Sequence, residues 1–172
     1  KLAGLTMYGL ASASKHPAVA AMGAIPMDYH TRDFAEAIRQ AEPDGLDAVF
    51  DGMSRIEYIH RGLALLRRGG RLVSFGEPSS FRVLFQMLAT LIRVNLPPRG
   101  RSFRLYGTST YFLFDKRPFL EDWAALFRLL EADVIRPVIA ARFPILEAAK
   151  ANALLESGTV TGNLVLLAPE LL

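Results

Sequence analysis

The chain has 172 residues, of which 51% are apolar and 22% are charged, and it contains no cysteine. This composition is typical of a single folded domain, and it excludes a disordered chain, a disulfide scaffold, a cysteine-ligated zinc site and a catalytic thiol. The 20 Lys and Arg residues exceed the 17 Asp and Glu residues by only three, so no nucleic-acid partner is expected, because phosphates require a concentrated basic face.

The remaining polar residues give few signs of a metal site or of targeting. His16, His30 and His60 are far apart in the sequence and lack the spacing of metal ligands, so no metal is expected. The chain has no charged-then-apolar signal pattern, and the absence of cysteine is compatible with a reducing compartment, so we expect a cytoplasmic location. It begins at Lys1 rather than at a methionine, which suggests a fragment of a longer protein.

Short β-rich runs alternate with amphipathic stretches in the first half of the chain. In chain order they predict a strand over residues 5–11, a helix over 15–22, a strand over 24–29, a helix over 32–40, a strand over 46–51, a helix over 56–66 and a strand over 71–76. Ser14 and Thr31 are the predicted N-caps of the first two helices, and Gly23 ends the first helix. The apolar run 46–51 is expected to be buried on both faces of a parallel sheet, and residues 68–70 to form a tight turn.

The second half is less regular. It predicts a helix over residues 81–96, a strand over 103–108, a helix over 119–132, a strand over 138–143, a helix over 144–155 and a strand over 161–167. The helix 81–96 is too short and too charged to span a bilayer, so we expect it to be buried or to face a second copy. Three βα steps in series predict an α/β fold with a doubly wound, mostly parallel sheet.

The glycine-rich turn G-x-G-x-x-G that follows the first strand of a dinucleotide-binding fold is absent. Residues 5–11 therefore fit the second strand of such a fold, and the predicted sheet lacks its first strand. After the second strand, an acidic residue would select the free 2′-hydroxyl of NAD, but this chain has Ser12, Ser14 and Lys15 there. These donors suit a 2′-phosphate and predict NADP selection. On spacing alone, a helix cap at Ser14 and a solvated Lys15 explain the same residues.

Several short segments together carry a resemblance to one family. They are residues 9–15, 22–24, 27–29, 46–52, 66–76, 135–138, 143–151, 154–158 and 161–166. Through them essentially the whole chain resembles the C-terminal nucleotide-binding part of the zinc-free quinone oxidoreductases, the zeta-crystallin-like branch of the medium-chain dehydrogenase/reductase superfamily. The resemblance implies a partial Rossmann domain over 1–172, in which 138–172 includes segments that pack on an N-terminal substrate domain absent from this chain.

The resemblance also implies an NADP(H) cofactor and a set of contacts to it. Ser12, Lys15 and Tyr29 match the positions around the adenosine 2′-phosphate, and Phe75 and Gly76 match the strand end beside the nicotinamide. The other matched positions are Tyr106, Gly107 and Thr108 at the next strand end, and Asn163. No catalytic residue is assigned, because no histidine or pair of carboxylates lies where the strand ends converge.

The predicted function is the cofactor domain of an NADPH-dependent oxidoreductase that transfers hydride to a small quinone or enone. The chain alone is expected to bind NADPH weakly or not at all and to be inactive. The resemblance also implies a homodimer, formed through the edge strand 103–108, because an exposed apolar edge can pair with a second copy. Without a first strand, either strands 5–11 and 46–51 pair directly or residues from outside the chain fill the slot.

Two alternatives stay open. One is a non-catalytic interaction or membrane-surface module, in which helix 81–96 contacts an anionic surface or partner with Arg93, Arg99, Arg101 and Arg104. Membrane contact is not expected, because few charges are involved. The other alternative is a different Rossmann-like enzyme, such as a methyltransferase, although the resemblance favours the oxidoreductase.

Overall fold

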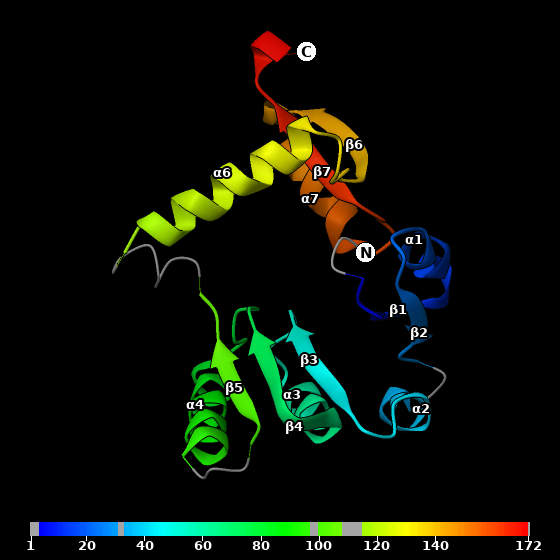
Figure 1. Ribbon diagram of the computed structural model, residues 1–172. Coiled ribbons are helices and arrows are strands. Elements are labelled where there is room, and N and C mark those ends of the chain that lie inside the picture. Colours follow the sequence, from blue (N-terminus) through cyan, green and yellow to red (C-terminus); the bar gives the residue numbers. More distant parts are fainter. Residues whose placement is uncertain (1–3, 31–32, 97–99, 108–114, 172) are drawn as a thin grey trace.

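The computed structural model describes residues 4–30, 33–96, 100–107 and 115–171, which alternate between strands and helices (Figure 1). The strands are β1 (Tyr8–Ala11), β2 (Ile25–Asp28), β3 (Leu46–Asp51), β4 (Leu66–Ser74), β5 (Ser102–Leu105), β6 (Ile139–Pro144) and β7 (Asn163–Leu167). The helices are α1 (His16–Ala21), α2 (Phe34–Ala41), α3 (Ile56–Leu65), α4 (Phe81–Asn95), α6 (Arg117–Glu131) and α7 (Ala148–Glu156). Short 3-10 turns cover Ala13–Lys15, Ile145–Glu147 and Pro169–Leu171.

The described strands form three parallel sheets, with the orders β1-β2, β3-β4-β5 and β6-β7. The series β2-β1 followed by β3-β4-β5 is the order of a doubly wound dinucleotide-binding sheet without its first strand, so the predicted fold class is confirmed. Within the described ranges β1 pairs only with β2, and β3 only with β4. The predicted direct pairing of the strands at 5–11 and 46–51 is therefore wrong.

A first cluster of apolar side chains joins the β1–β2 pair to α2 and α3. Its buried members are Phe34, Ala35, Ile38 and Leu65, and Tyr8, Met27, Leu46 and Tyr58 pack against it. The Tyr8 hydroxyl donates a hydrogen bond to Glu42 Oε1 at 2.7 Å, which raises the pKa of Tyr8 because the phenol is the donor and the carboxylate lies beside it.

Helix starts differ from the predicted caps. Asp33 caps α2, since its Oδ1 accepts from the Ala35 N–H at 2.9 Å, whereas Thr31 lies outside the described residues. The Ala35 N–H, with the Arg61 guanidinium beside it, holds the pKa of Asp33 below its ordinary value. Ser14 lies inside the 3-10 turn that precedes α1, so its predicted capping role is wrong. Gly23, with φ of 87°, follows α1 as predicted.

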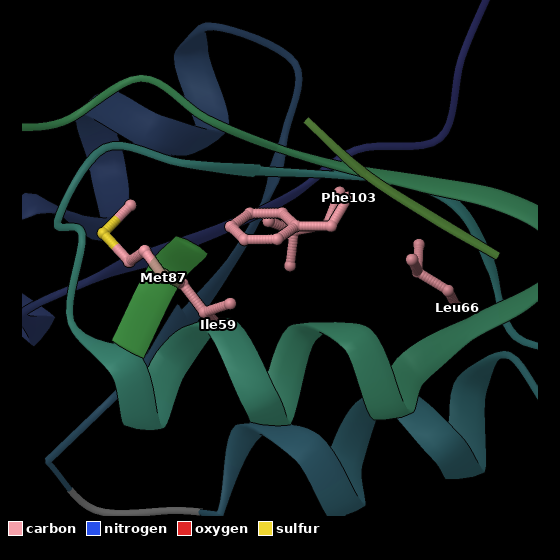
Figure 2. Close-up of a cluster of buried hydrophobic side chains, with 5 residues drawn as sticks. Ile59, Leu66, Met87 and Phe103 are labelled. Atoms are coloured by element: carbon pink, nitrogen blue, oxygen red, sulfur yellow. The ribbon is translucent and has the colours of Figure 1, made fainter. Parts of the chain in front are cut away.

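The main core lies between the β3-β4-β5 sheet and helices α3 and α4. It consists of the buried residues Ile59, Leu66, Leu72, Met87 and Phe103. Figure 2 shows the Phe103 ring in the middle of this cluster, with Ile59 and Met87 on one side and Leu66 on the other. α3 covers one face of β3, and Phe50 on that strand is 73% exposed. The predicted burial of residues 46–51 on both faces is therefore wrong.

The predicted turn at residues 68–70 is instead part of β4. The register with β3 shifts between Leu46 and Ala48, so the extra residues form a bulge in β4. Gly69 has φ of 84°, a conformation that glycine adopts without steric strain. The strand therefore begins at Leu66, directly after α3.

Two helices leave much apolar surface exposed. α4 buries only Met87 and Thr90, so the predicted burial of this helix is only partly correct. α6 buries no residue. Among the described helices, none has both the length and the apolar content needed to cross a bilayer.

Candidate cofactor-binding site

The carboxyl ends of β3, β4 and β5 carry a closely hydrogen-bonded group of backbone and side chains. The Phe75 N–H donates to the Asp51 carbonyl, and the Tyr106 N–H donates to the Ser74 carbonyl, both at 2.9 Å. These bonds align the residues that follow the three strands along one edge of the sheet. Ligands of open α/β sheets bind at this edge.

The Asp51 side chain links several residues at this edge of the sheet through hydrogen bonds. Its side chain is buried and accepts hydrogen bonds from the Ser74 hydroxyl at 2.8 Å and from the N–H groups of Met53 and Ser54, both at 3.1 Å. The Ser54 hydroxyl donates to the Gly76 carbonyl at 2.5 Å and lies 3.1 Å from the Ser74 hydroxyl. The carboxylate thus fixes the loop after β3 to the loop after β4.

Gly76 is required by this packing. A Cβ atom at that position would lie 2.3 Å from the Gly52 carbonyl oxygen and 2.9 Å from the Ser54 hydroxyl. The glycine is therefore explained by the contact between the two loops, and it is not by itself a sign of a bound ligand.

Two partly exposed aromatic residues follow the strands beside this hydrogen-bonded group. Phe75 is 54% exposed and Tyr106 is 45% exposed, each directly after its strand. Gly107 follows Tyr106 and is exposed, whereas Thr108 lies outside the described residues. The structure therefore aligns Phe75, Gly76, Tyr106 and Gly107 along one edge of the sheet, with two partly exposed aromatic residues among them.

A second set of predicted residues lies at the ends of β1 and β2. Ala11 and Asp28 are register partners in this parallel pair, so Ser12 and Tyr29 follow at adjacent strand ends. The Ser12 and Ser14 hydroxyl oxygens are 3.3 Å apart, and the Lys15 N–H donates to the Ser12 carbonyl at 2.9 Å, which folds the turn back on itself. The turn after β1 thus carries two hydroxyls and Lys15, and Tyr29 follows the adjacent strand. The Asp28 carboxylate at the end of that strand accepts a hydrogen bond from the His30 N–H at 2.8 Å.

Asn163 is the exception among the predicted residues. It begins β7, in the separate β6-β7 sheet. Its backbone N–H donates to the Val138 carbonyl at 2.8 Å, and its side-chain amide reaches the same oxygen at 3.4 Å. The structure thus uses Asn163 to join two segments of the C-terminal unit.

The sequence analysis does not predict a role at the site for Asp51, Ser54 or Ser74. The pattern that could have indicated one is an acidic residue at the end of an apolar strand, followed by a glycine and, two residues further, a serine. Ser54 has φ of 50°, which marks a tight connection between β3 and α3.

The side chains present can be compared with the needs of two possible bound groups, a zinc ion and a nicotinamide dinucleotide. The described residues contain no cluster of three or more His, Cys, Asp or Glu side chains, and they do not fit a zinc ion. The described residues instead offer hydroxyl and ammonium donors after β1 and aromatic side chains after β4 and β5, which are residue types that can contact a phosphate and a flat ring. Two cavities in the described part, of about 570 and 400 Å³, are lined by other residues.

Comparisons with known proteins give a consistent picture. The family model described as zinc-binding dehydrogenase matches residues 22–166. The synaptic vesicle membrane protein VAT-1 homolog of Danio rerio is 42% identical over 73 residues, which cover 42% of this chain and 15% of that protein. The 2-haloacrylate reductase of a Burkholderia species is 28% identical over 144 residues, or 82% of this chain and 41% of that protein.

Solved structures share the fold. The JamJ enoyl reductase superposes with a TM-score of 0.78 at 20% sequence identity, over 96% of this chain and 48% of that protein. At this identity the likeness shows the fold alone. The chain spans less than half the length of each of these three relatives.

Proposed function

The chain belongs to the zinc-binding dehydrogenase family, in the zinc-free, quinone-oxidoreductase-like branch of the medium-chain dehydrogenase/reductase superfamily, and we propose that it is the cofactor-binding half of an NADP(H)-dependent oxidoreductase. In such an enzyme the bound nicotinamide supplies the hydride. The chain contributes binding and orientation, and the other half of the enzyme contributes the substrate-contacting residues.

The observation that carries the cofactor proposal is the donor set after β1. Ser12, Ser14 and Lys15 follow the strand, and no carboxylate lies in that turn. A 2′-phosphate carries about two negative charges near neutral pH, and hydroxyl and ammonium donors bind such a group with charge-assisted hydrogen bonds. Tyr29 follows the adjacent strand end, and its phenol is proposed as a further donor.

The proposed substrate is a small quinone or an enone. Phe75 and Tyr106 are partly exposed aromatic residues at the nicotinamide end of the proposed site, and aromatic side chains beside the hydride donor suit a flat, electron-poor acceptor. Gly107, which is exposed, adds no side chain at the same edge. Asn163, in the β6-β7 sheet, would reach the cofactor only through the packing of this sheet in the whole enzyme.

We also propose a role for the C-terminal unit formed by β6, α7 and β7. Its sheet is separate from β3-β4-β5, and many of its apolar side chains are exposed, among them Ile145, Leu146 and Leu155. Burying these side chains against an N-terminal substrate domain would stabilise both parts.

Binding of adenosine fragments to the full 172-residue chain tests the cofactor proposal. Adenosine 2′,5′-bisphosphate and AMP differ only in the 2′-phosphate, and their affinities can be measured by NMR titration even where binding is weak. We expect the bisphosphate to bind at least about ten-fold more tightly, since hydrogen bonds to charged groups are the strong ones. We also expect it to shift the amide signals of Ser12, Lys15 and Tyr29.

The Lys15→Ala variant should lose this preference, whereas Lys150→Ala, which removes an exposed lysine from α7, should keep it. Equal binding of the two nucleotides by the unchanged chain would exclude NADP selection at this corner. Steady-state reduction of a quinone by the chain alone would contradict the proposal that a second domain supplies the substrate site.

A further inference from the structure

The outward face of α4 is an apolar stripe. It consists of Phe81, Phe85, Leu88 and Ile92 on the helix and Leu96 at its end. Their spacing of three or four residues places them on one side of the helix. Phe81 and Leu96 are each 82% exposed and Phe85 is 69% exposed, so the stripe is open along the whole helix, about 22 Å at the usual rise per residue.

The stripe is exposed because α4 packs against the rest of the unit with its opposite side. Met87 and Thr90 are buried and face α3 and β5, so the helix is fixed to the sheet by its other side. In Figure 1, α4 forms the outer flank of the β3-β4-β5 sheet. The stripe is therefore held on a rigid support and points away from the core.

Positive charge lies next to the stripe. α4 contains Arg82 and Arg93 and no acidic residue. Arg93 also lines a cavity of about 570 Å³ together with Arg68 and Arg101. None of these four arginines takes part in the ion pairs found among the described residues. Among the described residues of the cavity wall, the other polar side chains are His60 and Thr90, whose Nε2 and Oγ1 atoms are 3.3 Å apart.

This cavity is distinct from the proposed cofactor site. Arg68 lies near the beginning of β4, and Arg101 directly precedes β5. The proposed nicotinamide edge is formed instead by Phe75 and Tyr106, which follow the same two strands. The arginines therefore lie at the amino ends of the strands, at the opposite end of the sheet.

The charge pattern distinguishes between two occupants of the stripe. A second copy packed on the same face in a two-fold pair would bring the arginines of one α4 near those of the other, without an acid on either helix to compensate. An anionic membrane surface accepts apolar side chains and attracts arginines at the level of the headgroups. The surface therefore suits a bilayer better than a copy of itself.

Against the expectation from the sequence, we propose that α4 and the adjoining arginine-lined cavity form a docking surface for membranes that contain anionic phospholipids, because the exposed stripe and the cavity add to the few charges. The stripe enters the boundary between headgroups and acyl chains. Arg82 and Arg93 contact lipid phosphates beside it, and the cavity lined by Arg68, Arg93 and Arg101 receives one anionic headgroup. The strand ends that carry the proposed cofactor site stay outside the lipid.

Vesicle flotation of the full chain tests this surface. The vesicles are made of phosphatidylcholine alone or of phosphatidylcholine mixed with phosphatidylserine. We expect binding only to the mixed vesicles, and weaker binding as the salt concentration rises. The double variant R93Q/R101Q should lower the partition coefficient about 30-fold, which is the effect of removing two arginines from an anionic surface.

Two matched control variants test whether vesicle binding depends on this surface or only on exposed apolar area and net charge in general. The variant F85S/I92S should lose binding, while L120S/F127S, which removes two similarly exposed apolar side chains from α6, should keep it. R128Q/R142Q lowers the net charge by the same amount as R93Q/R101Q, and it should bind like the unchanged chain. Circular dichroism of each variant confirms that it is folded before its binding is compared.

Other outcomes would overturn the proposal. They are absence of binding to the mixed vesicles, equal binding to both kinds of vesicle, and equal losses in the control variants. Competition by inorganic phosphate alone, without binding to vesicles, would assign the cavity to a free anion. A dimer in sedimentation velocity that F85S/I92S dissociates, again without binding to vesicles, would assign the stripe to a second copy.

Discussion

The side chain of Asn95 pairs with the backbone of Phe103 in both directions. The Phe103 N–H donates to Asn95 Oδ1 at 3.0 Å, and Asn95 Nδ2 donates to the Phe103 carbonyl at 2.8 Å. Asn95 is the last residue of α4, and Phe103 is a fully buried residue of β5. The Asn95 side-chain amide therefore attaches the end of α4 to the edge of the sheet. It makes the two backbone hydrogen bonds that a neighbouring strand would otherwise make with Phe103.

Asn95→Ala should lower the free energy of unfolding by about 2 kcal/mol, because it leaves two backbone groups of a buried residue without partners. Urea unfolding followed by circular dichroism measures the change. Asn152→Ala, which removes an exposed asparagine from α7, is the matched control and should change the stability by less than about 0.5 kcal/mol. Equal effects of the two substitutions would contradict a structural role for this pair.

Asp51→Ala should lower the free energy of unfolding by roughly 3 kcal/mol, since the carboxylate accepts bonds from two N–H groups and one buried hydroxyl. Ser74→Ala should have a smaller effect in the same direction. Asp47, on the same strand, forms only an exposed ion pair with Arg67, so Asp47→Ala should change the stability by less than about 1 kcal/mol. The same urea titration ranks the three variants, and a different order would refute the role given to Asp51.

Asp33→Asn should reduce the dependence of stability on pH in the acid range. The pKa of Asp33 is lowered in the folded chain, first by the Ala35 N–H and then by Arg61. The ionised carboxylate therefore stabilises the fold above its pKa in the unfolded chain, about 4, and this contribution is lost as the pH falls through the lower folded value. Asparagine is also a good N-cap, so the substitution removes mainly the charge.

Thermal unfolding at a series of pH values measures this effect. The difference in melting temperature between the unchanged chain and Asp33→Asn should be largest above pH of about 4 and should shrink in more acidic solution. A difference that grows as the pH falls would have the wrong sign for a carboxylate with a lowered pKa.

Homodimerisation through β5 stays a prediction, and Asn95 limits where it can occur. The outward backbone groups of Phe103 are already occupied. The Tyr106 N–H points toward β4, so by alternation the N–H of Leu105 faces the open edge. Leu105→Pro should therefore abolish dimerisation with little effect on the pairing of β4 with β5, whereas Leu105→Val should keep both. Sedimentation velocity distinguishes these results, and a dimer that survives Leu105→Pro would exclude this edge.

Much of the fold follows from local patterns. The predicted strand 46–51 coincides with β3, because an apolar run between Gly45 and Gly52 leaves little choice of boundaries. The predicted cap of α2 differs from the observed one because Thr31 and Asp33 are both good capping residue types. The structure shows Asp33 as the cap, bonded to the Ala35 N–H and in contact with Arg61. Periodicity cannot show such a contact between distant segments.

The exposed residues were harder to predict, because burial depends on what covers each surface. Phe50 and the α4 stripe have the composition of buried segments, yet no described helix covers them. In the candidate site, the alignment of Phe75 with Tyr106 follows from parallel strand order, which the βα pattern predicts. The hydrogen bonds of Asp51 with Ser74 join residues 23 positions apart, and a single sequence contains no signal for that partnership.

The division into three sheets also predicts the order in which parts of the chain should unfold. Three described core residues have no exposed surface, and all lie in the unit built on β3, β4 and β5: Ile59, Leu72 and Phe103. The β6-β7 unit buries only Ala151 of α7. Amide protons should therefore exchange with solvent earliest in the C-terminal unit and latest along β4. The polypeptide would lose its structure in stages, with the central sheet the last to unfold.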